Sequence, residues 1–180
     1  TEERLVFSYQ GGDPRKNFKT MLDVAFLWAS NKTSRKVCIY GNEEEIKMKY
    51  KRHPLFASIA LELIDRPSGA VLTRVLNNSV GFLYLSEAEG FGLPPLEAMS
   101  LGCCPVMFDH SALAEVFRGW PGLISPNANA HEIASLLDKL LSRPQVEQEC
   151  TNFASAFSWN VTGQLLLSQI LTYGRSEAHL

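Results

Sequence analysis

Short apolar runs alternate along the chain with longer segments in which apolar residues recur every three or four positions. Six runs have the length and composition of buried strands: Leu5–Tyr9, Val37–Tyr40, Leu61–Asp65, Val80–Leu85, Cys104–Phe108 and Leu123–Ser125. Helical spacing occurs in residues 18–29, 71–76 and 133–141. Strands that are apolar almost throughout, and that helices separate, are typical of a parallel sheet covered on both faces. The pattern therefore predicts an α/β fold with a doubly wound, Rossmann-like and mostly parallel six-stranded sheet.

The length and apolar content of the chain fit one domain. It has 180 residues, of which 46% are apolar and 20% charged, enough for a sizeable core. No internal repeat or low-complexity linker divides residues 1–180, so we expect a single domain. Residues 144–180 have the pattern of a helical tail, with Leu165, Leu166, Ile170 and Leu171 on one face. We expect this tail to pack either on the domain itself or on another one.

Charge and hydropathy exclude several classes of function. The formal net charge is −2, and no cluster of lysines and arginines interleaves with aromatic residues, which argues against nucleic acid as a partner. No run of eighteen apolar residues occurs, and the first residues, Thr-Glu-Glu-Arg, do not resemble a signal peptide. We therefore expect a cytoplasmic protein that does not span a membrane.

Cysteines and histidines give no sign of a metal site. The four cysteines lack CxxC spacing and the density of a disulfide scaffold, which favours a reduced, cytoplasmic setting, and Cys103 and Cys104 are expected to be core residues. The histidines lack the spacing of metal ligands and stand in no nucleophile motif; they are His53, His110, His131 and His179. His110 follows the fifth predicted strand, which places it near the edge where ligands bind.

The loop after the fourth predicted strand has the features of an anion site. Residues 86–99 leave a buried strand, pass Gly90 and Gly92, and enter a helix at Pro94-Pro95. Proline suits the first helical turn, because its missing N–H would have no partner there. Free backbone N–H groups and the positive end of the helix dipole then face the loop, and the glycines let an anion approach closely. The pattern predicts a phosphate at this helix N-terminus.

Two carboxylates flank the predicted phosphate position. Glu89 precedes the turn, and Glu97 is expected in the first helical turn, where a carboxylate can accept two hydrogen bonds from a vicinal diol such as that of a ribose. Taken alone, the glycines are compatible with a simple turn, and Glu97 with a complement to the helix dipole. The complete string Glu89-Gly-Phe-Gly-Leu-Pro-Pro-Leu-Glu97 is far more specific than its parts.

This string resembles the signature of group 1, or family 4, retaining glycosyltransferases of the GT-B fold. The resemblance implies that Glu89 is catalytic at the donor sugar and that Glu97 holds the ribose hydroxyls. It also implies contacts to the sugar and the phosphates from Gly90, Phe91, Gly92 and Leu93. The chain would then be one half of a GT-B fold, the C-terminal domain that binds a nucleotide-sugar donor. The N-terminal acceptor-binding domain would be absent from it, so the chain alone should bind but not transfer.

A second loop extends the resemblance. Gln10-Gly-Gly-Asp-Pro-Arg-Lys-Asn17 follows the first strand and resembles the loop in which a basic side chain neutralises the nucleotide pyrophosphate. The resemblance assigns this role, and with it a catalytic one, to Lys16, and assigns a lesser binding role to Arg15. Gly12 stands at a nucleotide-binding position where many relatives carry an arginine. Taken alone, Arg15 and Lys16 would be a solvated helix start.

The likeness continues to the end of the chain. It places Gly41, after the second strand, beside the nucleotide, and Arg66, after the third strand, near the base. Residues 111–116 and 157–159 resemble further landmarks of the family. We expect Glu115 and Trp159 in these landmarks to be structural.

The implied reaction is the retaining transfer of a hexose from a nucleotide sugar, such as GDP-mannose or a UDP-sugar, to a glycan or lipid-linked acceptor. Negative charge builds on the leaving pyrophosphate and positive charge on the sugar ring, so the site needs a cation at one end and a carboxylate at the other. Lys16 and Glu89 supply them. The resemblance implies transfer without a dedicated divalent cation, and the absence of an Asp-x-Asp motif agrees with this, so we expect no obligatory metal and no other cofactor. The loop after the first strand resembles that of mannosyltransferases, which favours a mannosyl donor.

Two other functions stay open. A sugar-nucleotide epimerase of similar architecture would keep the nucleotide grip and use different carboxylates. A non-catalytic nucleotide-binding or subunit-interaction module would keep the fold, although Glu89, Glu97 and Lys16 argue against a decayed site. The sequence also leaves open a peripheral membrane association through the absent domain, the base, the sugar and the acceptor.

Overall fold

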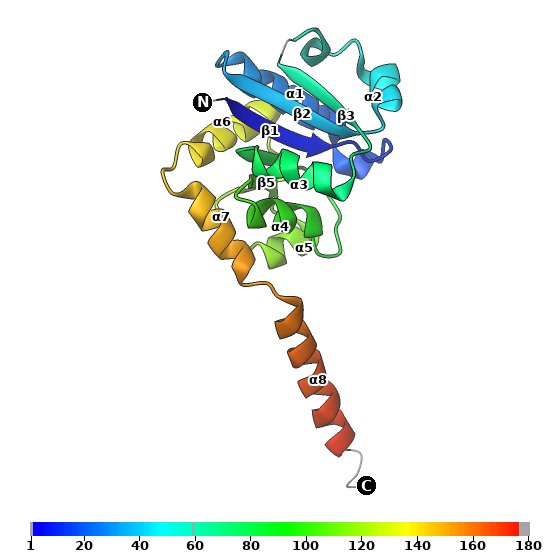
Figure 1. Ribbon diagram of the computed structural model, residues 1–180, viewed down its shortest axis with the longest axis vertical. Coiled ribbons are helices and arrows are strands. Elements are labelled where there is room, and N and C mark those ends of the chain that lie inside the picture. The colour runs from blue at the N-terminus through cyan, green and yellow to red at the C-terminus, as the bar shows by residue number, and fades with distance from the viewer. Residues whose placement is uncertain (1, 59, 177–180) are drawn as a thin grey trace.

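Six parallel strands form one sheet, as the sequence pattern predicts. The computed structural model describes residues 2–58 and 60–176 (Figure 1). The strands are β1 Glu3–Ser8, β2 Arg35–Gly41, β3 Leu61–Asp65, β4 Gly81–Tyr84, β5 Cys104–Phe108 and β6 Leu123–Ile124. Their order in the sheet is β3-β2-β1-β4-β5-β6, and every pairing is parallel. The predicted doubly wound α/β fold is confirmed.

Helices connect the strands and cover both faces of the sheet. The helices of the described residues are α1 Phe18–Ser30, α2 Glu43–Tyr50, α3 Gly69–Asn77, α4 Leu93–Ser100, α5 Ser111–Val116, α6 Ala130–Leu141, α7 Val146–Ser155 and α8 Trp159–Ser176, with the short 3-10 helices η1 Pro14–Lys16 and η2 Pro54–Ala57. Helix α1 packs with α6, and α4 packs with α7. The β1–β2 and β4–β5 connections run in opposite directions along the sheet, so right-handed crossovers place α1 and α4 on opposite faces. Figure 1 shows α3 and α4 in front of the sheet and α1 behind it.

The inner strands β1, β4 and β5 are largely buried on both faces, which explains their apolar sequences, whereas the edge strand β3 exposes Glu62 and Asp65. Leu5, Val6 and Phe7 of β1 have no exposed surface, and every residue of β4 and β5 is buried. Cys103 and Cys104 are buried core residues, as predicted. A strand covered on both faces cannot alternate apolar and polar residues, because each position faces a helix layer.

The hydrophobic pattern does not predict α2. Its sequence, EEEIKMKY, contributes one buried side chain, Ile46, so it lacks the spacing that marks the other helices. The ends of the helix explain its presence: the side chain of Asn42 accepts a hydrogen bond from the N–H of Glu45 at 3.2 Å. Three glutamates occupy the first turn and two lysines the last turn, which complements the helix dipole.

The predicted tail consists of two helices with different surroundings. Helix α7 packs on α4 and buries Val146, Cys150 and Ala154. Helix α8 leaves the body of the domain (Figure 1), and its Leu165, Leu166, Ile170 and Leu171 are each more than half exposed. The expectation that the tail packs on this domain is therefore right for α7 only. Among the described residues, no helix has the length and apolar character needed to cross a membrane.

A buried arginine joins the first two strands to both helices of one face. Arg35, at the start of β2, is 4% exposed. It donates to the Glu3 carboxylate at 2.9 Å and to the Trp28 carbonyl of α1 at 2.8 Å. It also donates to the carboxylate of Asp138 in α6. A buried charge is stable only when it is paired and hydrogen-bonded, so these contacts hold α1 and α6 in place over the sheet.

We expect Arg35→Met to lower the free energy of unfolding by about 3 kcal/mol, because it removes the donor that Glu3, Trp28 and Asp138 share. Urea denaturation followed by circular dichroism measures this change. Arg74→Met, at an exposed position of α3, is the matched control and should change the free energy of unfolding by less than about 0.5 kcal/mol. Equal effects of the two substitutions would show that the Arg35 contacts do not support the fold.

Candidate functional site

The order of strands changes direction between β1 and β4. From β1 the chain proceeds outward through β2 and β3, and then returns to the other side of β1 to form β4, β5 and β6. The helices that follow the loops after β1 and β4 therefore lie on opposite faces of the sheet, and a doubly wound fold has its ligand crevice between two such loops. In doubly wound sheets, ligands bind in this crevice beyond the carboxyl ends of the strands. The two loops singled out in the sequence, after β1 and after β4, are the ones that meet here.

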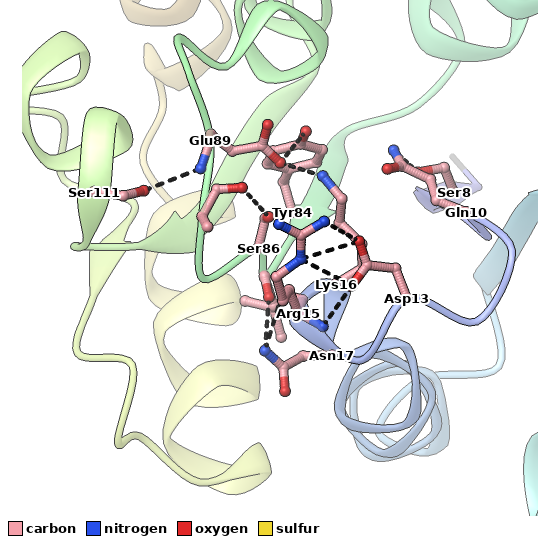
Figure 2. A network of polar contacts seen from close by, with 12 residues as sticks. Ser8, Gln10, Asp13, Arg15, Lys16, Asn17, Tyr84, Ser86, Glu89 and Ser111 are labelled. Carbon is pink, nitrogen blue, oxygen red and sulfur yellow. Dashed lines mark hydrogen bonds and ion pairs between the residues drawn. The ribbon is translucent and has the colours of Figure 1, made fainter.

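The loop after β1 points one basic side chain at the crevice. The short helix η1 begins after Asp13, whose carboxylate accepts the N–H of Arg15 at 3.0 Å. Arg15 also pairs with Asp13 through its guanidinium at 2.8 Å, and its side chain is 63% exposed. Lys16 instead forms an ion pair with Glu89, with both side chains less than a fifth exposed (Figure 2). Of the two predicted cations, Lys16 is the one that the fold places in the site.

Hydrogen bonds connect Glu89 to η1, to β4 and to the start of α5. Its Oε1 accepts from the Lys16 ammonium and from the hydroxyl of Tyr84, the latter at 2.7 Å. Its backbone N–H donates to Oγ of Ser111, at the start of α5, at 3.3 Å. Figure 2 shows the side chains of Lys16, Tyr84 and Glu89 converging. The two residues predicted to be catalytic are therefore in direct contact.

The surroundings of Glu89 keep it ionised. Burial alone would raise its pKa, but hydrogen bonds from Lys16, Ser86 and Tyr84 outweigh burial and bring the pKa below its ordinary value. A lowered pKa in the folded state means that the ionised carboxylate stabilises the fold above its ordinary titration range. That contribution is lost as the pH falls through the folded-state pKa. At neutral pH the site thus holds a carboxylate and an ammonium.

Further hydrogen bonds join the two loops directly. The side chain of Asn17 donates to the Leu85 carbonyl at 3.1 Å and to the Glu87 carboxylate at 2.9 Å. The N–H of Glu87 donates to the Arg15 carbonyl at 2.9 Å. Asn17 has a φ of 49°, a left-handed conformation that asparagine tolerates better than most residues. These bonds set the position of Lys16 relative to Glu89.

The glycine loop enters α4 as the sequence predicts. Gly92 caps the helix with a φ of 96°, and a Cβ there would lie 2.5 Å from Leu113 and 3.0 Å from Phe117, so only glycine fits. The space beside Gly90 is open. Pro94 and Pro95 have no N–H, so the amides that remain for an anion belong to the preceding residues, including Phe91 and Leu93. The side chains of Phe91 and Leu93 are 40% and 45% exposed.

The predicted position of Glu97 in the first turn of the helix is wrong. Helix α4 begins at Leu93, so Glu97 is its fifth residue and lies in the second turn. A helix that begins one residue before the proline pair accounts for the shift. Glu97 is exposed, and it lies close enough to Tyr40 at the end of β2 to add to the rise that burial causes in the pKa of that tyrosine.

The remaining predicted residues line the same edge of the sheet but do not contact Lys16 or Glu89. Gly41 is the last residue of β2, and a Cβ there would lie 2.7 Å from the Tyr9 carbonyl oxygen. The Gly41 carbonyl accepts a hydrogen bond from the N–H of Arg66 at 2.8 Å. Arg66 is exposed and borders a hollow of about 440 Å³ beside α2. A Cβ at Gly12 would lie only 2.7 Å from Nζ of Lys49 in α2. Lys49 therefore occupies the space beside this glycine.

Sequence reasoning missed Tyr84, Asn17 and Ser111. In the sequence Tyr84 is one more apolar residue of a buried strand, and Asn17 ends the loop after the first strand with no role of its own assigned. Ser111 lies 22 positions from Glu89, and its role depends on α5 being placed beside the glycine loop. A positional signal existed for Tyr84 alone, since it ends a strand next to the predicted crevice.

The histidines occupy different parts of the fold. His53 contacts Asp23 at 2.9 Å, and His131 is in the first turn of α6. His110 precedes Ser111 and is exposed at the end of β5, near the site as expected. His179 lies outside the described residues. Within residues 2–58 and 60–176, no group of three or more histidine, cysteine, aspartate or glutamate side chains is arranged to hold a metal ion.

Curated relatives and solved structures resemble this chain. It is 33% identical over 90 residues to the serotype-specific mannosyltransferase WbdA of Escherichia coli, covering 48% of this chain and 11% of that protein. It is 21% identical over 192 residues to GDP-mannose:cellobiosyl-diphosphopolyprenol alpha-mannosyltransferase of Komagataeibacter xylinus, covering 100% of this chain and 49% of that protein. The chain thus spans half of their length or less.

Among solved structures, the GtfA/B complex matches with a TM-score of 0.76 at 17% identity, over 97% of this chain and 36% of that one. The catalytic domain of cholesterol-alpha-glucosyltransferase from Helicobacter pylori matches with a TM-score of 0.67 at 20% identity, over 88% of this chain and all of that one. These likenesses show the fold, which is half of a GT-B fold. The family profile described as glycosyl transferases group 1 matches residues 1–157. The chain therefore belongs to the group 1 glycosyltransferases.

Proposed function

We propose that this domain binds a nucleotide-sugar donor in the crevice between β1 and β4 and serves the retaining transfer of a hexose to a glycan or lipid-linked acceptor. One observation carries the proposal: an ammonium and an ionised carboxylate, from loops more than seventy residues apart, meet at the point where the strand order reverses. Membership of the transferase family favours this function over a sugar-nucleotide epimerase or a module without activity.

The chemistry of glycosyl transfer accounts for the two charges. Breaking a glycosyl–phosphate bond leaves negative charge on the departing diphosphate, which the Lys16 ammonium and the amides before α4 stabilise. Positive charge develops on the sugar ring, and the Glu89 carboxylate is the group at the site that can face it. A diphosphate carries more negative charge than one carboxylate. It therefore competes with Glu89 for the Lys16 ammonium and frees the carboxylate to act on the sugar.

The other predicted residues fit the rest of a nucleotide sugar. Glu97, exposed on α4 beside Tyr40, is proposed to accept hydrogen bonds from the ribose hydroxyls. Gly41 and Arg66 lie further along the same edge and are proposed to border the base. Both curated relatives described above are named as mannosyltransferases, and one of them as acting with GDP-mannose, so we propose a mannosyl donor with guanine as the base.

The acceptor is proposed to bind to another domain. The family resemblance places acceptor binding in an N-terminal domain, and the relatives are at least twice as long as this chain. Such a domain would close over the crevice and exclude water from the reaction. Binding of the donor, rather than transfer, is therefore the property to measure on these 180 residues.

We expect Lys16→Met to weaken the binding of GDP or UDP by at least about tenfold, because it removes the cation that pairs with the diphosphate. Isothermal titration calorimetry of the 180-residue chain measures this. Lys19→Met is the matched control, since Lys19 is 75% exposed on α1 and pairs with Asp23, and it should leave the affinity within about twofold. If Lys16→Met bound the nucleotides as tightly as the unchanged chain, the diphosphate would not bind at Lys16.

Removal of the Glu97 carboxylate tests the proposed ribose contact. We expect Glu97→Ala to weaken nucleotide binding by about tenfold, because two charge-assisted hydrogen bonds to the diol are lost. Glu149→Ala, on the exposed side of α7, is the control and should have no measurable effect. A ligand that lacks the ribose, such as pyrophosphate, should bind both variants equally. Unchanged nucleotide affinity in Glu97→Ala would place the ribose elsewhere.

The dependence on metal is a separate test. We expect nucleotide affinity to change by less than about twofold between 5 mM magnesium and 5 mM EDTA, since Lys16 and the helix N-terminus neutralise the diphosphate without a bound cation. The same calorimetric titration in the two buffers measures this. A loss of binding on chelation would show that a divalent cation accompanies the nucleotide.

A further inference from the structure

Tyr84 contacts both members of the ion pair. It is the last residue of β4 and is 5% exposed. Its hydroxyl donates to Oε1 of Glu89 at 2.7 Å, and the Lys16 ammonium lies 5.4 Å from the centre of its ring, within the range of a cation–π interaction (Figure 2). One buried side chain therefore holds the carboxylate through its oxygen and the ammonium through its ring.

Lys16 and Tyr84 use the same oxygen of the carboxylate. Both donate hydrogen bonds to Oε1 of Glu89, and neither donates one to Oε2. The backbone of Glu89 is also fixed, because its N–H donates to Ser111 at 3.3 Å. A carboxylate that is anchored at its backbone and at one oxygen has little freedom to rotate. The direction of Oε2 is then set by the protein rather than by the substrate.

We propose that Tyr84 is a positioning residue for Glu89, whose hydroxyl, together with the Lys16 ammonium, holds Oε1 in place and leaves Oε2 to face the donor sugar. This inference rests on the proposed function, since it assumes that Glu89 faces a sugar. When a diphosphate draws Lys16 away, the Tyr84 hydroxyl becomes the donor that keeps the carboxylate oriented. Tyr84 acts through Glu89 and need not touch the donor.

The charges around Glu89 agree with this role. Lys16 and, at longer range, Arg15 face it from the loop after β1, Tyr84 faces it from β4, and the neutral Ser86 and Ser111 complete the shell. Burial and the neighbouring Glu89 carboxylate raise the pKa of Tyr84 far above its ordinary value. The phenol therefore keeps its proton at neutral pH and remains a donor.

Tyr84→Phe isolates the hydroxyl, because it keeps the ring that packs in the core and faces Lys16. Tyr40→Phe is the matched control: Tyr40 ends β2 at the same edge, and its hydroxyl bonds to Ser8 rather than to Glu89. The first readout is the titration of the Glu89 side-chain carboxyl carbon by NMR in the chain without ligand. We expect the pKa of Glu89 to rise in Tyr84→Phe and to stay unchanged in Tyr40→Phe.

The second readout is the preference of the chain for a nucleotide sugar over the bare nucleotide, measured by calorimetry with GDP-mannose against GDP and UDP-glucose against UDP. We expect this preference to fall about tenfold in Tyr84→Phe, while affinity for the bare nucleotide stays within about twofold. In a Glu89→Gln background, Tyr84→Phe should have no further effect on the preference, because a residue that acts through Glu89 has nothing left to position.

The outcomes separate the two proposals. An unchanged titration of Glu89 in Tyr84→Phe overturns the positioning role whether or not any nucleotide binds, since this readout needs no ligand. An equal loss of preference in the Glu89→Gln background also overturns it and indicates a general structural effect. If the titration shifts as expected and the unchanged chain binds no nucleotide, Tyr84 positions Glu89 and the proposed donor site is wrong. A variant that is merely destabilised would lower the melting temperature without moving the titration of Glu89.

Discussion

Strand β1 hydrogen-bonds to β2 on one side and to β4 on the other, and the candidate site depends on this arrangement. A strand at the centre of a parallel sheet must be covered on both faces, which explains why Leu5 to Phe7 have no exposed surface. The chain leaves β1 and β4 toward opposite faces, and the loops after these strands meet at the switch point, where hydrogen bonds from Asn17 join them. The crevice is thus a consequence of strand order, and the loops that border it supply Lys16 and Glu89.

The electrostatics of the site follow from the partial burial of the Lys16 and Glu89 side chains. Lys16 and Glu89 lose much of their contact with water, and such charges are stable only in contact with partners. Tyr84, Ser111 and the bonds made by Asn17 supply that support, so the pair is held in a defined geometry before any substrate arrives. A site that is organised in advance does not need to reorient its dipoles during the reaction, which is the main electrostatic advantage of an enzyme over water.

The fold and the family agree with each other, although sequence identity to the solved structures is low. An identity of 17% to 20% with TM-scores between 0.67 and 0.76 indicates that the sheet and its helices are retained while most side chains differ. The exposed α8 and the exposed ring of Phe91 lie at the end of the domain that carries the glycine loop. The chain spans about half the length of the Komagataeibacter xylinus relative.

The sequence by itself determined the six strands, the parallel α/β fold class and the chemistry of the loops. Continuous apolar runs in six places predict six buried strands, and the string from Glu89 to Glu97 predicts a glycine turn into a helix that begins with proline, because both signals are local. Helix α2 escaped prediction because capping and charge, rather than a hydrophobic face, hold it together. Glu97 lies in the second turn because α4 begins at Leu93 rather than at Pro94. The sequence pattern does not specify the first residue of a helix this closely.

Only the tertiary structure decided which residues meet. It directed Lys16 into the crevice and Arg15 to solvent, although the two are adjacent in sequence, because Asp13 and η1 set the direction of each side chain. It also brought Tyr84 and Ser111 to Glu89, and Lys49 to the space beside Gly12. Contacts of this kind arise between elements that are distant along the chain. They depend on how strands are ordered and how helices pack, and not on any pattern that a single segment carries.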